Sequence, residues 1–223
     1  MDTNTKAVII NAALGGWYPR GQARLRASLV HHGFSWDVRT WTEWPNNNFD
    51  KANNYHVKAS AFEEAIKAGY THILWLDSSV WAIGKAEKIF DIIDEQGYYL
   101  WKNGYNCAQE CSDKCLEYFN LSRDDAEKMP CVSTSMFGVN LGNPKGKEFI
   151  ERWLKSARDG VFNGSRLHDN QSKDQRFLHH RQDQSTASVI ANQMGLYIHE
   201  MNHYSSYYQK TVPDSVIFLM QGL

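Results

Sequence analysis

The sequence lacks three features that would narrow its class at once: a long hydrophobic run, a strong net charge and abundant cysteine. No apolar stretch approaches the ~18 residues that a membrane-spanning helix needs, and the first residues lack the basic-then-apolar layout of a secretory signal. The 24 Lys and Arg residues balance 25 Asp and Glu residues, so the net charge of -1 creates no overall field for nucleic acid or an anionic membrane. These absences predict a globular protein of the cytoplasm.

The four cysteines lie close together in the chain. Cys107, Cys111 and Cys115 are spaced four apart, which would place three thiols on one helix face, and Cys131 follows later. Structural zinc sites normally combine two separated ligand pairs, and a single remaining cysteine does not complete that pattern. Disulfides are therefore favoured over a metal cluster, and free buried thiols are favoured over both in a cytoplasmic protein.

What the chain does contain is ample material for a core, since 42% of its 223 residues are hydrophobic and 13% are aromatic. Strand-like runs alternate with helical periodicity, which predicts an α/β protein whose sheet is mainly parallel. No repeat or linker divides the chain, so we expect one domain over residues 1–223. The expected strands are 7–13, 33–41, 71–76, 98–101, 136–141 and 215–219, and the expected helices are 20–29, 57–68, 85–96, 146–157 and 183–195.

The middle of the chain is expected to be irregular. Residues 102–130 read as loop-rich, with one short helix at 112–119 and another that Ser122 caps with Asp125 three residues later. Residues 160–180 read as a polar loop. The sequence thus predicts a regular first half and a looser second half.

The most informative stretch is the apolar run that ends on Asp77, followed by Ser78 and Ser79. A strand covered on both faces is a continuous hydrophobic run, and ligands of open α/β sheets bind beyond the carboxyl ends of such strands. Asp77 therefore stands where a ligand site is expected. The alternative is that it only caps the next helix or turns the chain.

A second cluster follows the first expected strand, where Gly15 and Gly16 lead into a helix that carries Arg20, Arg24 and Arg26. A glycine turn at a helix N-terminus exposes backbone N–H groups to an anion, and arginine forks suit phosphate oxygens. The spacing matches neither the P-loop nor the dinucleotide fingerprint, so a plain strand-to-helix turn remains an equal interpretation.

A third cluster stands at the start of the helix expected at 183–195, where Arg181, Gln182, Asp183 and Gln184 follow one another. Such hydroxyl-binding side chains at one helix N-terminus are typical of a sugar site, and an aspartate there can act as a general base. The alternative is that Asp183 is only an N-cap that stabilises the helix dipole.

Taken in order, these segments resemble the nucleotide-sugar-dependent glycosyltransferases of the GT-A fold. The likeness runs through VIINAALGGWYPRGQARLRASL, VKASAFEEAIKAGY, HILWLDSSVW, STSMFGVNLGNP and HHRQDQSTASVIANQMG, and it spans most of the chain. The resemblance implies a GT-A-like mixed sheet flanked by helices. It also implies that residues of about 1–101 bind the nucleotide sugar and residues of about 102–223 bind the acceptor.

The resemblance also implies roles for single residues. Asp77 stands at the first aspartate of the family's D-x-D motif and Ser79 at the second, so these two are the expected ligands of Mn²⁺ or Mg²⁺. Gln221 stands where many metal-dependent members have a histidine, which leaves the need for a metal open. Asp183 is the expected catalytic residue. The expected donor-binding residues are Asn11, Ala12, Gly15, Arg20, Lys58, Asp77, Ser78, Ser79, Arg181, Gln182 and Gln184.

The predicted function is transfer of a sugar, in the manner of a hexosyltransferase, from a nucleoside diphosphate-sugar such as a UDP-sugar. The acceptor is open among a glycan, a small molecule, a protein and a modified nucleic acid, and retention or inversion is equally open. A haloacid dehalogenase phosphatase is excluded because it needs an aspartate at position 79. A non-catalytic nucleotide- or sugar-binding module of the same fold is the alternative.

Overall fold

A mixed five-stranded sheet forms the centre of the computed structural model, which describes residues 5–163 and 172–222. The strand order is β2 (Asp37–Trp41), β1 (Ala7–Ala12), β3 (His72–Leu76), β8 (Met136–Asn140) and β5 (Tyr98–Tyr99). β1 runs parallel to β2 and β3, whereas β8 runs antiparallel to both β3 and β5. In this sheet only β8 therefore opposes the common direction, and the predicted mixed, mainly parallel sheet is confirmed.

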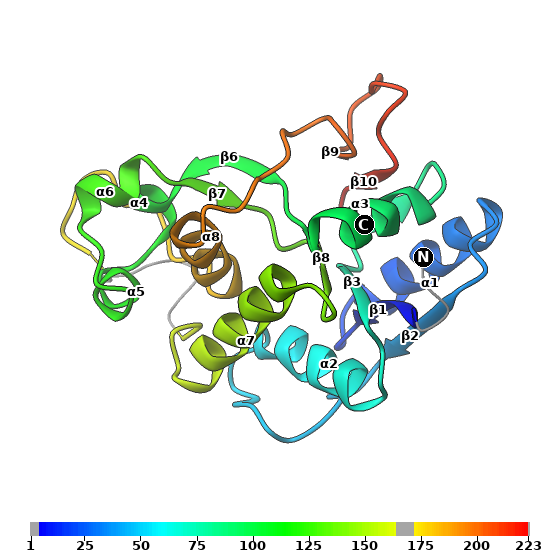
Figure 1. Cartoon of the computed structure of the whole chain (residues 1–223), viewed down its shortest axis with the longest axis horizontal. Coiled ribbons are helices and arrows are strands. Elements are labelled where there is room, and N and C mark those ends of the chain that lie inside the picture. The colour runs from blue at the N-terminus through cyan, green and yellow to red at the C-terminus, as the bar shows by residue number, and fades with distance from the viewer. Residues whose placement is uncertain (1–4, 164–171, 223) are drawn as a thin grey trace.

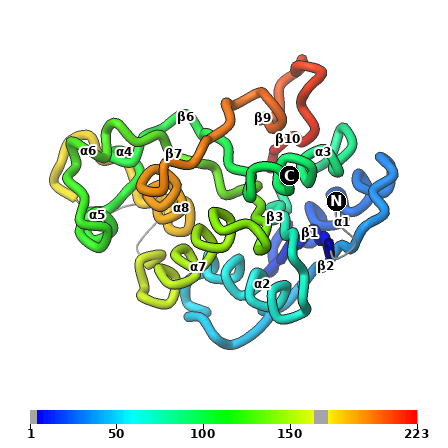
Figure 2. The backbone as a smooth tube through the Cα atoms, viewed as in Figure 1, coloured from blue at the N-terminus to red at the C-terminus, as the bar shows by residue number. Residues whose placement is uncertain are grey.

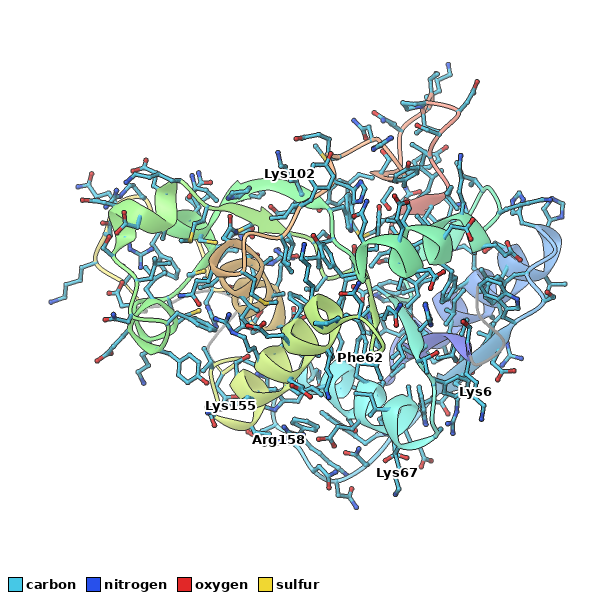
Figure 3. The ribbon with its side chains drawn as sticks, in the orientation of Figure 1. Lys6, Phe62, Lys67, Lys102, Lys155 and Arg158 are labelled. Carbon is cyan, nitrogen blue, oxygen red and sulfur yellow. The ribbon has the colours of Figure 1, made fainter. Side chains whose placement is uncertain are left out.

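Successive strand residues point to opposite faces of this sheet, and the residues on both faces are buried. In β1, Val8 and Ile10 join one hydrophobic cluster and Ile9 joins the other. Helices α2 (His56–Lys67) and α7 (Pro144–Arg158) cover the first face, and α1 (Tyr18–His31) and α3 (Glu87–Gln96) cover the second (Figure 1). Phe62 of α2, labelled in Figure 3, stacks on Phe137 with ring centroids 4.9 Å apart.

The second half adds smaller elements beside this sheet. These elements are α4 (Cys107–Glu110), α5 (Asp113–Tyr118), α6 (Arg123–Glu127), α8 (Asp183–Gln193), β4 (Val80–Ala82), β6 (Lys102–Asn106), β7 (Pro130–Val132), β9 (Ser205–Tyr207) and β10 (Phe218–Met220). Figure 2 shows α8 between α7 and the short helices α4, α5 and α6, with β6 and β7 above it. A three-stranded sheet of order β4-β10-β9 brings the end of the chain back to the segment after Asp77.

Residues 102–130 are more regular than predicted. The sequence of β6 is polar and contains Gly104 at φ +93°, so it lacks the alternation that announces a strand, and its pairing with β7 is irregular. The four-residue helix α4 depends on a capping box between Asn106 and Gln109. The predicted Ser122 cap is confirmed, since its hydroxyl accepts from the Asp125 N–H.

Other boundaries also differ. The strand expected at 98–101 is shorter, as β5, and Trp101 forms only an isolated bridge with His199. The strand expected at 215–219 is shorter and later, as β10. Part of the expected polar loop, 164–171, lies outside the described residues. In the described ranges, no helix has the length and apolar character needed to cross a membrane.

The four cysteines are free thiols and all are buried. They form a small hydrophobic cluster with Leu116, Ala126 and Val189. The Sγ atoms of Cys107 and Cys131 lie 3.8 Å apart, and the Cys111 thiol donates to the Ser185 carbonyl of α8. The thiols thus pack the short helices against α8.

Candidate functional site

Asp77 follows the last residue of β3, at the carboxyl end of the parallel strands, as predicted. Its backbone N–H donates to the carbonyl of Ser135 at 2.7 Å, and the Trp75 indole donates to its Oδ1 at 2.7 Å. The Asp77 side chain remains 31% exposed, more than the side chains of Lys58 and Asp183 described below. A fixed, accessible carboxylate therefore lies at the edge where ligands of such sheets bind.

Lys58 of α2 joins Asp77 to the start of α8. Its Nζ lies 3.2 Å from Oδ1 of Asp77 and 3.0 Å from Oδ2 of Asp183, and it donates to the Thr134 carbonyl at 2.9 Å. Burial opposes the charge of Lys58, but the carboxylates of Asp183 and Asp77 outweigh burial and raise its pKa. The ammonium therefore holds two carboxylates from distant parts of the chain together.

Asp183 is the first residue of α8 and does not act as the N-cap. Gln182 occupies the cap position with φ +49° and ψ -113° and makes no side-chain capping bond. The Asp183 side chain points to Lys58 instead, and its backbone carbonyl accepts from the Trp153 indole at 3.0 Å. The alternative that Asp183 is only an N-cap is therefore wrong: its carboxylate forms an ion pair with Lys58, and the residue is only 1% exposed.

Asn11, Ala12 and Ser78 lie beneath the site and are buried. The Asn11 amide donates to the Leu76 carbonyl at 2.7 Å and to the Ser78 hydroxyl at 3.2 Å. Its oxygen accepts from Gln22 of α1 at 2.7 Å. These side chains support the turn that carries Asp77, and their predicted donor contacts remain predictions.

Gly15 and Arg20 lie in the loop and first turn that follow β1, the strand next to β3, and both are exposed. Gly15 and Gly16 adopt left-handed φ values of +66° and +56°, which glycine tolerates at no steric cost. α1 begins without a side-chain cap, but Pro19 has no N–H and the Arg20 N–H donates to the Trp17 carbonyl at 2.9 Å. The predicted anion contacts of the glycine turn stay a prediction.

Ser79 lies beside the end of the chain. Its carbonyl accepts from the Gln221 N–H at 2.9 Å and from Nη2 of Arg24 at 2.9 Å, and the same nitrogen donates to the Gln221 carbonyl at 2.8 Å. Positions 79 and 221 are thus adjacent in space. Within residues 5–163 and 172–222, no group of three His, Cys, Asp or Glu side chains is placed to hold a metal ion.

Gln184 and Arg181 open onto a second polar cluster around Glu110, which the sequence did not indicate. Glu110 is 1% exposed and accepts from Asn103 at 2.6 Å and Gln184 at 2.8 Å. His179 lies 3.2 Å from its other oxygen, and the Arg181 N–H donates to its carbonyl. The sequence around Glu110 has no pattern that predicts its burial. The burial results from the packing of α4, which contains Glu110, against α8.

Known proteins were compared with the sequence and with the structure of the whole chain. No protein-family model matches the chain, and no curated protein sequence does. Mouse xyloside xylosyltransferase 1, in its apo crystal form, superposes with a TM-score of 0.55 at 9% identity, over 96% of this chain and 97% of that one. A glycosyltransferase involved in glycosylation of the major capsid of PBCV-1 superposes with a TM-score of 0.56 at 13% identity, over 96% and 93%. The predicted GT-A-like fold is confirmed.

Proposed function

We propose that the chain is a glycosyltransferase that moves a sugar from a nucleoside diphosphate-sugar to an acceptor. The observation that carries the proposal is the bridge from Asp77 through Lys58 to Asp183 at the carboxyl edge of β3. The GT-A-like fold adds support, since two glycosyltransferases share it. The donor half is about residues 1–101, and the buried thiols suit the reducing cytoplasm.

In this proposal Asp77 accepts hydrogen bonds from donor hydroxyls. Lys58 and the Trp75 indole occupy its Oδ1, and no described residue donates to Oδ2. Asp183 acts from a buried position at the start of α8, where it pairs with Lys58. We favour UDP-sugars for the first titrations, as the resemblance implies.

The groups around Ser79 do not fit a divalent cation. Mg²⁺ and Mn²⁺ favour carboxylate, carbonyl and water oxygens, whereas the carbonyls of Ser79 and Gln221 already accept from the Arg24 guanidinium. Its positive charge would repel a second cation at the same oxygens. The predicted binding of Mn²⁺ or Mg²⁺ by Asp77 and Ser79 is therefore not part of the proposed function.

The acceptor half, about residues 102–223, presents the polar cluster around Glu110. Tyr105 and Tyr207 flank it, 45% and 44% exposed, and their rings contact His179 and Trp101 respectively. Exposed aromatic faces beside a carboxylate offer stacking and hydroxyl-binding contacts to an acceptor. Transfer assays with glycan, small-molecule, protein and nucleic-acid acceptors would identify its class.

Two measurements test the proposal. Calorimetric titration of a nucleotide-sugar panel, with and without Mn²⁺ or Mg²⁺, should detect at least one donor, and failure with all of them would reject the function. Asp183→Asn should lower transfer by at least ~100-fold while changing donor affinity only a few-fold, because the amide keeps the shape and loses the charge. Asp91→Asn, on the exposed side of α3, is the matched control.

Donor binding without hydrolysis or transfer in the wild type would favour the alternative, a non-catalytic binding module. Unchanged transfer by Asp183→Asn would instead remove Asp183 from catalysis. The two outcomes are separable because the first concerns the wild type and the second a variant.

A further inference from the structure

Arg24 lies on the face of α1 that packs against residues 78–82, the segment directly after Asp77. On this face Gly21 packs so closely that a Cβ there would stand 2.1 Å from the Ser78 carbonyl oxygen. One turn on, Arg24 reaches the Ser79 carbonyl, and Ser28 accepts from the Ala82 N–H at 2.9 Å. α1 is therefore held along residues 78–82, and Arg24 is held at the D-x-D-like position itself.

The guanidinium is fixed on three sides. Its Nη2 donates to the carbonyls of Ser79 and Gln221 at 2.9 and 2.8 Å, and its carbon lies 4.3 Å from the ring centroid of Trp81. Stacking on an indole and a carbonyl bridge together restrict the planar fork. Arg24 thus has one defined orientation before any ligand binds.

Arg24 is nevertheless a cation without a counterion. In the described part of the chain, no carboxylate lies within ion-pairing distance of it, and its buried Nε has no hydrogen-bond partner. Burial lowers the pKa of Arg24, which shows that its position disfavours the charge. A neutral amide could bridge two carbonyls without this cost, so cross-linking alone does not account for an arginine.

We propose that Arg24 is a fixed cation that binds the donor diphosphate in place of a divalent metal ion. The inference rests on the proposed function. Ser79 and Gln221, the two residues that Arg24 bridges, stand where the resemblance expects the second aspartate and the histidine. An arginine fork matches the geometry of phosphate oxygens, so the same charge can serve there without an ion.

The test is calorimetry in EDTA with UDP, uridine and inorganic pyrophosphate as probes. The wild type should bind UDP and pyrophosphate in EDTA, and Arg24→Gln should lower both affinities about ten- to hundredfold because a charge-assisted hydrogen bond is lost. Uridine affinity should not change. Arg24→Lys should be intermediate, since it keeps the charge but loses the fork.

Lys67→Gln is the matched control, because Lys67 is an exposed cation at the end of α2, on the other face of the sheet from Arg24. It should change UDP affinity less than twofold. In the double variant Arg24→Gln/Ser79→Asp, Mn²⁺ should restore UDP affinity. The new carboxylate is a ligand for Mn²⁺, and the bound ion supplies the positive charge that the arginine supplied before.

Each contrary result has a distinct meaning. Wild-type binding of UDP only with Mn²⁺ overturns the role of Arg24 but leaves the glycosyltransferase proposal standing. An equal loss of UDP and uridine affinity in Arg24→Gln, with a lower melting temperature, shows a purely structural residue. Failure of the wild type to bind any nucleotide sugar rejects the proposed function itself.

Discussion

Lys58 and Arg24 are two cations of one site in opposite surroundings. Lys58 is 6% exposed and lies between the carboxylates of Asp77 and Asp183, so its charge is neutralised within the protein. Arg24 is partly exposed, and among the described residues it donates only to uncharged carbonyls. A paired, buried cation organises the chain, whereas an unpaired cation held at the surface is available to an anionic ligand. The same charge thus serves structure at one position and recognition at the other.

The largest expected effect is on stability, from Lys58→Met. Removal of the ammonium leaves the buried Asp183 carboxylate without its partner and close to the Asp77 carboxylate, and loss of one partner from a buried ion pair costs about 3–5 kcal/mol of unfolding free energy. Urea unfolding measures the change. Lys67→Met, at the exposed end of the same helix and labelled in Figure 3 as the wild-type lysine, should stay within about 0.5 kcal/mol.

Arg24→Gln sharpens the comparison in the same experiment. It should cost about 1 kcal/mol in unfolding free energy, the usual net contribution of a hydrogen bond, because the carbonyl partners of Arg24 are uncharged and no buried charge is left without a partner. Equal costs for Lys58→Met and Arg24→Gln would contradict the division of roles between the two cations.

A second effect concerns how α1 presents Arg24. Gly21→Ala places a methyl group 2.1 Å from the Ser78 carbonyl oxygen, so the helix must move away from the motif. Overpacking of this kind costs about 1–3 kcal/mol, although alanine is the better helix former. Urea unfolding should show the loss, and titration with UDP should show weaker binding because Arg24 moves with the helix.

Ala27→Gly, at an exposed position of the same helix, measures how much the difference in helix propensity between alanine and glycine contributes to stability. It should cost about 1 kcal/mol and leave UDP affinity unchanged. If Gly21→Ala were stabilising and bound UDP normally, the close contact between α1 and the motif would not matter for binding.

The position of Asp77 could be predicted because local signals were strong. The run from His72 to Leu76 is fully buried, as its continuous hydrophobicity indicated, and a carboxylate directly after a buried strand has a place in the fold independent of later packing. The helix stop at Gly97 is equally local, with φ +91° at the cap.

The partners of these residues could not be predicted, because they depend on how distant elements meet. The Lys58–Asp183 pair needs α2 and α8 to approach, and the Arg24–Gln221 bond spans 197 residues. Glu110 was missed for the same reason. The resemblance assigned Lys58, Asp77 and Asp183 to one site without showing that a single ammonium joins them.

The smallest expected effect is on the pH dependence of stability. The two carboxylates raise the pKa of Lys58, so the folded chain keeps this proton at a pH where the unfolded chain releases it. The stabilisation is therefore complete below the ordinary lysine value of about 10.4, and it is lost as pH rises through the folded-state pKa. The slope cannot exceed about 1.4 kcal/mol per pH unit for one proton. Urea unfolding between about pH 9 and 11.5 should show this loss in the wild type and in Arg24→Gln, because both keep Lys58 and its two carboxylates. Lys58→Met removes the titrating group, so subtraction of its profile cancels tyrosine ionisation. Identical slopes in the wild type and Lys58→Met would mean that the Lys58 ammonium is not held by its carboxylates.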